Sequence, residues 1–138
     1  MGENGLVTRG PFLRSPERTR RLIHEAETRG VEVIIAGAAH PAGVIAAKTI
    51  LPVIGVPINS SPLNGLDSLF STVQMAGGIP FASMAIGKAG AKSAGIFAAQ
   101  IVARRSPDVA KPLLSYKKSL AEEVEAMGKR LHEKDPSD

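Results

Sequence analysis

Short apolar runs alternate with helix-like segments along the first hundred residues of the chain. Three of these runs have the length and apolar content of strands that are buried on both faces of a parallel sheet: residues 31–36, 52–58 and 79–86. Helices are predicted between the runs, at residues 42–49 and 65–75. Strands that alternate with helices predict an α/β fold in which ligands bind beyond the carboxyl ends of the strands.

Two of the predicted helices carry periodic apolar positions. The first has Leu66, Leu69, Phe70 and Val73 at helical spacing, and the second has Ala94, Phe97, Ala98, Ile101 and Val102 on one face. Residues 87–91 lack the Gly-Lys-Ser/Thr ending of a phosphate loop. They are predicted to form a tight turn between the third strand and the helix that follows it.

Helices are also predicted towards both ends of the chain. Ser15 and Pro16 indicate a helix start, because a hydroxyl can accept from an unpaired backbone N–H and Pro suits the first helical position. Gly30 is predicted to end this helix, and residues 1–14 are predicted to be irregular or to contain a short strand. Residues 107–134 have an apolar side chain every three or four positions, which predicts a long amphipathic helix lying over the domain or against another subunit.

Length and composition narrow the class of protein. A chain of 138 residues suits one domain that spans residues 1–138. The absence of Cys excludes disulfides, a thiolate nucleophile and a zinc-thiolate site. No signal-peptide pattern is present and no apolar run reaches the ~18 residues of a membrane span. A soluble, cytoplasmic protein without a membrane partner is therefore expected.

The net charge of +4 does not indicate a nucleic-acid partner. The 17 Lys and Arg residues and 13 Asp and Glu residues are interleaved near both ends of the chain, which is typical of solvated helix faces. The chain has four Phe, one Tyr and no Trp, and no aromatic platform accompanies the basic residues.

Candidate chemistry lies in two loops that lead from a strand into a helix, at residues 37–43 and 59–65. Both loops would place backbone N–H groups and positive helix ends at one edge of the sheet, where an anionic ligand can bind. The alternative is that their small residues serve only tight turns. His40 is the histidine at a strand end, and its ordinary pKa near ~6.5 allows proton exchange at neutral pH. No second histidine or carboxylate stands at the spacing of metal ligands, so no metal is expected.

Six phrases of the sequence occur together in one known family. They are residues 33–40, 46–49, 52–57, 63–69, 73–75 and 85–90. In this order and at these distances they resemble the family of carboxyaminoimidazole ribonucleotide mutases and aminoimidazole ribonucleotide carboxylases, from about Arg14 to the end of the chain. The resemblance implies a flavodoxin-like three-layer fold, a homo-octamer and catalysis without metal or organic cofactor. It also implies an aminoimidazole ribonucleotide as ligand, with a carboxyl group moved from the exocyclic nitrogen to a ring carbon.

The resemblance also implies site residues. Those expected to contact the ligand are Arg14, Gly37, Ala38, Ala39, Pro41, Ser60, Ser61 and Leu63. The family's phosphate-binding turn has no counterpart before Arg14, so the fold is expected to be N-terminally shortened. Leu13 stands where the family has its catalytic histidine, and Leu cannot carry a proton. His40, which matches the family's loop histidine, is therefore the candidate catalytic residue of this chain, in a loop three residues shorter than the family's.

Three interpretations follow. The first is an enzyme of purine biosynthesis of the mutase type. The second is an inactive or divergent family member that binds a small ligand or serves as an assembly subunit. The third is a truncated or engineered version of the enzyme.

Overall fold

The computed structural model describes residues 15–37, 41–59 and 62–134. The predictions made for residues 1–14, including the short strand and the role of Leu13, lie outside the described residues.

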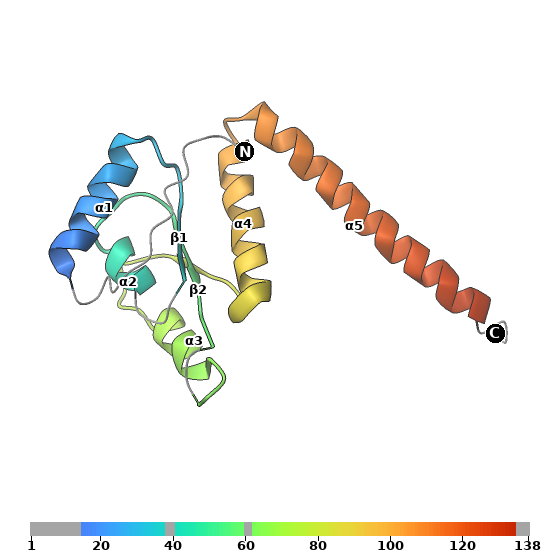
Figure 1. The fold of residues 1–138 in the computed structure, drawn as a ribbon, viewed down its shortest axis with the longest axis horizontal. Coiled ribbons are helices and arrows are strands. Elements are labelled where there is room, and N and C mark those ends of the chain that lie inside the picture. The colour runs from blue at the N-terminus through green and yellow to red at the C-terminus, as the bar shows by residue number, and fades with distance from the viewer. Residues whose placement is uncertain (1–14, 38–40, 60–61, 135–138) are drawn as a thin grey trace.

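The described strands form one parallel sheet with helices on both faces. The strands lie in the order β1 (Ile34–Gly37), β2 (Val53–Val56), β3 (Ala82–Ser83). In the register of the first pair, Ile34 lies opposite Val53 and Gly37 lies opposite Val56. In the described part of the chain β1 pairs with β2 alone, so β1 is an edge strand. The predicted α/β fold with parallel strands is confirmed (Figure 1).

Helices lie on both faces of this sheet, and the last helix packs on the one before it and extends beyond the sheet (Figure 1). They are α1 (Pro16–Thr28), α2 (Pro41–Ala46), α3 (Leu66–Val73), α4 (Gly87–Ala103) and α5 (Pro107–Lys134). On one face, Ile23 of α1 and Ile45 of α2 form a core with Val53 of β2. On the other face, Ile54 and Ala94 belong to a second core between β2 and α4. Side chains that alternate along β2 therefore hold the three-layer arrangement together.

The strands differ in length and burial from the prediction. All four residues of β2 are buried, as a central parallel strand requires, but Ile35 of β1 keeps 47% of its surface exposed. The predicted burial of the first strand on both faces is therefore wrong, because the face of β1 that carries Ile35 is only partly covered, whereas Ala36 on the opposite face is buried. Only Ala82 and Ser83 of the third run are paired. Pro80 lacks the N–H that a longer ladder would need.

The face of α3 that packs on the sheet is not the face predicted by apolar periodicity. Ser68 and Thr72 are buried, at 1% and 2% exposure. Leu66, Phe70 and Val73 are exposed, at 50% to 60%. Packing against the sheet has overridden the pattern, and α3 presents apolar side chains outwards.

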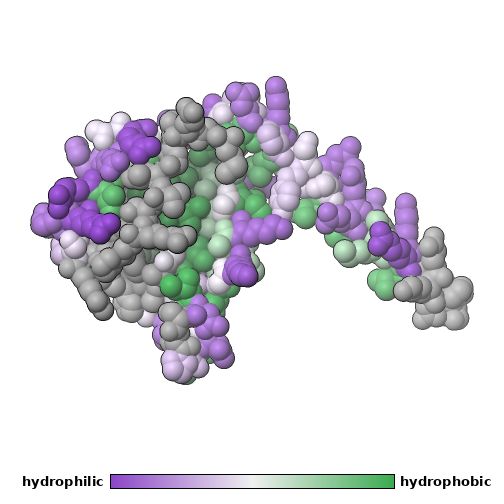
Figure 2. Space-filling view, in the orientation of Figure 1, coloured by the Kyte–Doolittle hydropathy of each residue, from purple (hydrophilic) through white to green (hydrophobic). Residues whose placement is uncertain are grey.

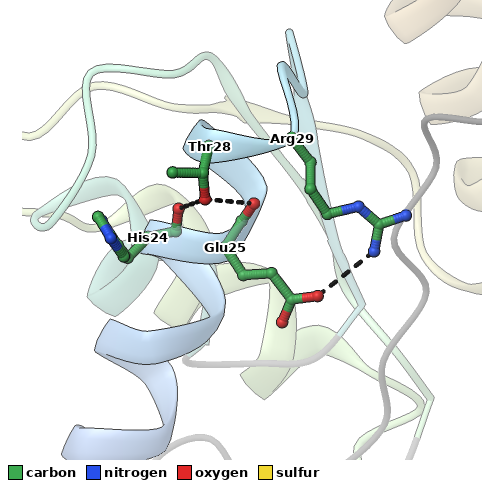
Figure 3. A network of polar contacts seen from close by, with 4 residues as sticks. All are labelled: His24, Glu25, Thr28 and Arg29. Carbon is green, nitrogen blue, oxygen red and sulfur yellow. Dashed lines mark hydrogen bonds and ion pairs between the residues drawn. The ribbon is translucent and has the colours of Figure 1, made fainter.

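The first helix begins and ends as predicted, although not by the predicted contact at its start. Ser15 is the N-cap residue, but its hydroxyl makes no capping hydrogen bond. At the other end Gly30 takes the left-handed conformation, with φ of 71°. Figure 3 shows two side-chain interactions in the last turn. The Thr28 hydroxyl donates a hydrogen bond to the His24 carbonyl oxygen at 2.6 Å, and Arg29 Nη1 forms an ion pair with Glu25 Oε1 at 3.3 Å. These side chains lie on the surface, so His24 has no part in a buried site.

The last two helices form the side of the molecule farthest from α1 (Figure 1). Residues 87–91 are the first turns of α4, so the predicted tight turn is wrong and the helix starts directly after Ile86. The long C-terminal helix is confirmed as α5. Where α4 and α5 touch, Lys92 Nζ lies 5.7 Å from the centroid of the Tyr116 ring. No helix in the described part of the chain is long and apolar enough to cross a membrane.

Candidate functional site

Both candidate loops leave the same edge of the sheet. Gly37, the last residue of β1, lies opposite Val56, the last residue of β2. The backbone turns from Gly37 to the start of α2 at Pro41 within four residues, and from Val56 to the start of α3 at Leu66 within ten. The predicted meeting of the two loops at the carboxyl edge is therefore what parallel strands of equal register produce.

A third helix begins at this edge and was not included in the predicted site. The Gly87 N–H, at the start of α4, donates to the carbonyl oxygen of Pro57 at 2.8 Å. Beside it, a Cβ added to Gly65 would lie 2.7 Å from Cγ2 of Ile86. These contacts bring the first turn of α4 against the loop between β2 and α3. Lys88 is exposed in that turn, so the edge gains a cation next to helix N-termini.

Ser68 positions the start of the loop between β2 and α3. Its Oγ accepts a hydrogen bond from the Ile58 N–H at 3.2 Å, and the Thr72 Oγ1 donates to the Ser68 carbonyl oxygen at 2.6 Å. Both hydroxyls are buried, and no buried side-chain polar atom of the described residues lacks a partner. Sequence reasoning missed Ser68. The available signal was a pair of hydroxyl residues four positions apart in a predicted helix.

The helices and loop segment nearest the carboxyl edge pack closely on β2 at Gly55, where there is no side chain. A Cβ on Gly55 would lie 3.1 Å from Thr72 Cγ2, 3.1 Å from Phe81 Cε2 and 3.2 Å from Ala42 Cβ. The start of α2, the end of α3 and the segment before β3 therefore all pack on the middle of β2. This close packing supports the two loops from below.

The structure describes three of the predicted site residues. Gly37 ends β1 and is exposed, the backbone of Pro41 starts α2, and Leu63 is 60% exposed. The Leu63 carbonyl oxygen accepts from the Leu66 N–H at 3.0 Å, which closes the turn before α3. The other predicted positions lie outside the described residues: Arg14, Ala38, Ala39, His40, Ser60 and Ser61.

An open hollow of about 560 Å³ lies at the opposite end of α3. Its lining consists of Thr72, Val73, Met75, Ala76, Gly77, Gly78, Ile79, Pro80, Phe81 and Ser83. Met75 in this lining lies against Gly43, the last residue of the first candidate loop, because a Cβ on Gly43 would lie 2.5 Å from Met75 Cε. The hollow therefore adjoins that loop. Ligands of open parallel sheets bind at the carboxyl edge, so the two loops and the hollow beside the first of them form the candidate site.

The described residues offer no ready metal site. No group of three or more His, Cys, Asp or Glu side chains among them is placed to hold a metal ion. Among the described residues, the groups that the carboxyl edge offers are backbone N–H groups, the Ser68 hydroxyl and the Lys88 cation.

Comparison with known proteins gives a consistent result. The family model described as AIR carboxylase matches residues 12–123. An N5-carboxyaminoimidazole ribonucleotide mutase of Thermotoga maritima is 50% identical over 123 residues, which cover 87% of this chain and 71% of the relative. The mutase of Pyrococcus horikoshii is also 50% identical over 123 residues, with 87% and 68% covered. That of Escherichia coli is 47% identical over 114 residues, with 80% and 68% covered.

Proposed function

The chain belongs to the AIR carboxylase family, and from this membership we propose that it is a purine-biosynthesis mutase acting on a carboxylated aminoimidazole ribonucleotide. The observation that carries the proposal is the identity of about half of the aligned residues with proteins named as this mutase, over 87% of the chain. The arrangement of the carboxyl edge supports it, because two loops and three helix starts meet there.

The reaction needs little from the protein beyond positioning and one proton. The bond between the carboxyl carbon and the exocyclic nitrogen breaks, and a bond forms between that carbon and the ring carbon. The nitrogen gains a proton and the ring carbon loses one, so the overall change requires no oxidant or reductant. A site for this step must hold the carboxyl group beside the ring and exchange one proton.

His40 is our candidate for the group that moves the proton. It is placed by sequence in the loop that leaves β1, between Gly37 and the start of α2. Its imidazole titrates near neutral pH in its ordinary state, which suits proton exchange in both directions. Leu13, at the position of the family's catalytic histidine, has no group that can take this role.

The remaining residues of the proposed site bind the nucleotide. Gly37, Ala38, Ala39 and Pro41 form the short loop against the base, and Ser60, Ser61 and Leu63 face it from the next loop. Arg14 contacts the phosphate or ribose. Lys88 adds a positive charge at the start of α4, where unpaired backbone N–H groups also attract phosphate.

A direct assay tests the proposal. The purified chain is incubated with N5-carboxyaminoimidazole ribonucleotide, and formation of the product carboxylated on the ring carbon is followed with time. We expect turnover that falls by about 10² to 10⁴ in His40→Gln, the range typical for loss of a general acid or base. The matched control is His24→Gln, which removes an exposed histidine on α1 and should leave the rate unchanged.

The alternative is a family member that binds the ligand without converting it. Absence of turnover in a sample with the far-ultraviolet circular dichroism of an α/β protein would contradict the enzyme proposal. Tight binding of the ribonucleotide in the same sample, measured by calorimetry, would then favour the inactive ligand-binding member. A wild-type rate in His40→Gln would overturn the role of His40 alone.

Assembly and location complete the proposal. The family resemblance implies a homo-oligomer, with the octamer as the expected form, and cytoplasmic purine synthesis as its setting. Exposed apolar side chains on α3 and α5 support assembly with further copies, because isolated apolar faces of this kind are usually covered by a partner.

A further inference from the structure

Met75 lies between the hollow and α2. It follows the end of α3, lines the hollow and keeps 37% of its surface exposed. The far end of its side chain covers Gly43 of α2, which is buried. A Cβ on Gly43 would lie 2.5 Å from Cε and 2.7 Å from Sδ of Met75. The thioether of Met75 therefore occupies the place that a side chain at position 43 would take.

This contact closes one side of the first core. Ala42, which precedes Gly43 in α2, is 1% exposed and belongs to this core with Ile45 and Val53. A thioether suits this place, because it is flexible and largely apolar. The Ala47 N–H donates to the Gly43 carbonyl oxygen at 3.0 Å. The backbone that the thioether covers is thus part of the hydrogen bonding at the end of α2.

Oxidation of the sulfur would change this contact. The chain contains four Met and no Cys, so all of its sulfur atoms are thioethers. Hydrogen peroxide transfers one oxygen atom to a thioether, and the sulfur is oxidised to a sulfoxide while the peroxide is reduced to water. The sulfoxide is polar and bulkier, and burial of such a group without a hydrogen bond is costly. An oxidised Met75 is therefore expected to leave Gly43 and turn into the hollow.

We propose that Met75 is a site of reversible sulfoxidation, and that its modification loosens α2 beside the candidate site. In the thioether form, Met75 holds α2 against the sheet. In the sulfoxide form, Gly43 is open to water and α2 opens more often. A methionine sulfoxide reductase with a thiol reverses the change, because the thiol is oxidised to a disulfide and the oxygen leaves as water. The consequence for turnover rests on the proposed function, because α2 carries the end of the first candidate loop.

Met127 provides an internal control. It is 60% exposed on α5, whose outer part extends away from α2 (Figure 1) and alternates hydrophobic with hydrophilic residues (Figure 2). Met84 packs partly buried against the second core, so it should react more slowly. Met127 should be oxidised at least as fast as Met75, without any effect on α2.

Mass spectrometry and hydrogen exchange on the same peroxide-treated samples of the full chain test the proposal. The gain of one oxygen atom is followed at each methionine. As Met75 is oxidised, the Ala47 amide should exchange at least roughly tenfold faster. Methionine sulfoxide reductases A and B with dithiothreitol should restore slow exchange. Unchanged exchange after full oxidation of Met75 would overturn the proposal, and so would a Met75 that resists peroxide while Met127 reacts.

Three variants separate the modification from its consequence. Met75→Leu keeps an apolar side chain over Gly43 without a sulfur, so peroxide should leave exchange of the Ala47 amide slow. Met127→Leu is the matched control and should respond to peroxide as the wild type does. Gly43→Ala places a methyl group where the thioether lies, which displaces the flexible end of Met75 into the hollow.

In Gly43→Ala, Met75 should be oxidised at least roughly threefold faster, because its sulfur is more exposed. Exchange of the Ala47 amide should no longer respond to peroxide, because the new methyl group covers the backbone. Faster exchange in peroxide-treated Met75→Leu would assign the effect to another methionine and refute the proposal.

Turnover is measured separately, so that this proposal and the proposed function can fail independently. In an active chain, peroxide should lower the rate in proportion to the oxidised fraction of Met75 and should spare Met75→Leu. A rate unchanged by oxidation of Met75 would refute its link to the site. A chain without turnover would contradict the proposed function alone, and the mass and exchange measurements would still decide the role of Met75.

Discussion

Gly55 occupies the point where three elements meet on the sheet. The space that a side chain would fill is bounded by Ala42 of α2, Thr72 of α3 and Phe81 before β3. Because each of these neighbours would have to move by a few tenths of an ångström, no single shift makes room for a larger residue. The size of this one residue therefore sets the separation between the sheet and the layer that carries both candidate loops.

Gly55→Ala should lower the free energy of unfolding by about 1 to 3 kcal/mol, the usual cost of overpacking a core. Urea denaturation of the two proteins measures the difference. Gly77→Ala is the control, because no heavy atom lies within 4 Å of a Cβ at that position. Equal stability of Gly55→Ala and Gly77→Ala would show that the three neighbours relax without cost.

At the scale of single elements, two glycines of α4, Gly90 and Gly95, have opposite effects on stability. Gly90 is buried, and a Cβ there would overlap the carbonyl oxygen of Ala85 in the chain leading to the helix. Gly95 is exposed, with nothing within 4 Å of its added Cβ. The first glycine permits close packing of backbone, whereas the second only weakens the helix.

Substitution of these glycines should change stability with opposite sign. Gly90→Ala must displace backbone, so we expect a loss of at least about 2 kcal/mol in the free energy of unfolding. Gly95→Ala should raise it by roughly 0.5 to 1 kcal/mol, because Ala is the better helix former. Thermal and urea unfolding of both variants provide the comparison, and a destabilised Gly95→Ala would contradict this account of α4.

The sequence predicts the order and type of these elements better than it predicts which face of each element is buried. Alternating apolar runs were sufficient for the parallel sheet, and three-to-four spacing for α5, because these patterns follow directly from strand and helix geometry. The orientation of α3 was not predictable in this way. Ser68 and Thr72 can be buried since their hydroxyls find partners after folding, and this leaves Phe70 outside.

The candidate site shows the same division. The alternation of strands and helices predicted that Gly37, at the end of β1, and Leu63, after β2, lie at one edge of the sheet, as the strand register shows. Their contact with a ligand stays a prediction. The contribution of α4 was missed, because Lys88 reaches that edge only through the bond between the Gly87 N–H and the Pro57 carbonyl oxygen. Contacts between residues thirty positions apart carry no periodic signal.

At the scale of the whole molecule, some apolar side chains are buried in two cores and others are exposed to solvent. Two small cores hold the sheet between α1 and α2 on one face and α4 on the other. Further apolar side chains point outwards from α3 and the second half of α5. A chain of this size buries a limited share of its surface, and association through these outer faces would add to its stability.

Within residues 15–37, 41–59 and 62–134, β1 pairs with β2 alone, and this has a consequence for the exchange of its backbone hydrogens with solvent. The Ile34 N–H donates to the Pro52 carbonyl oxygen at 2.9 Å, and alternation along a parallel ladder turns the Ile35 N–H away from β2. After transfer to deuterated water, the amide of Ile35 should therefore exchange at least roughly tenfold faster than that of Ile34, whereas β2, paired on both sides, should exchange slowly throughout. Equal protection of Ile34 and Ile35 would reveal a further strand on this edge in solution. Deuterium uptake along four residues thus reports whether the sheet ends at β1.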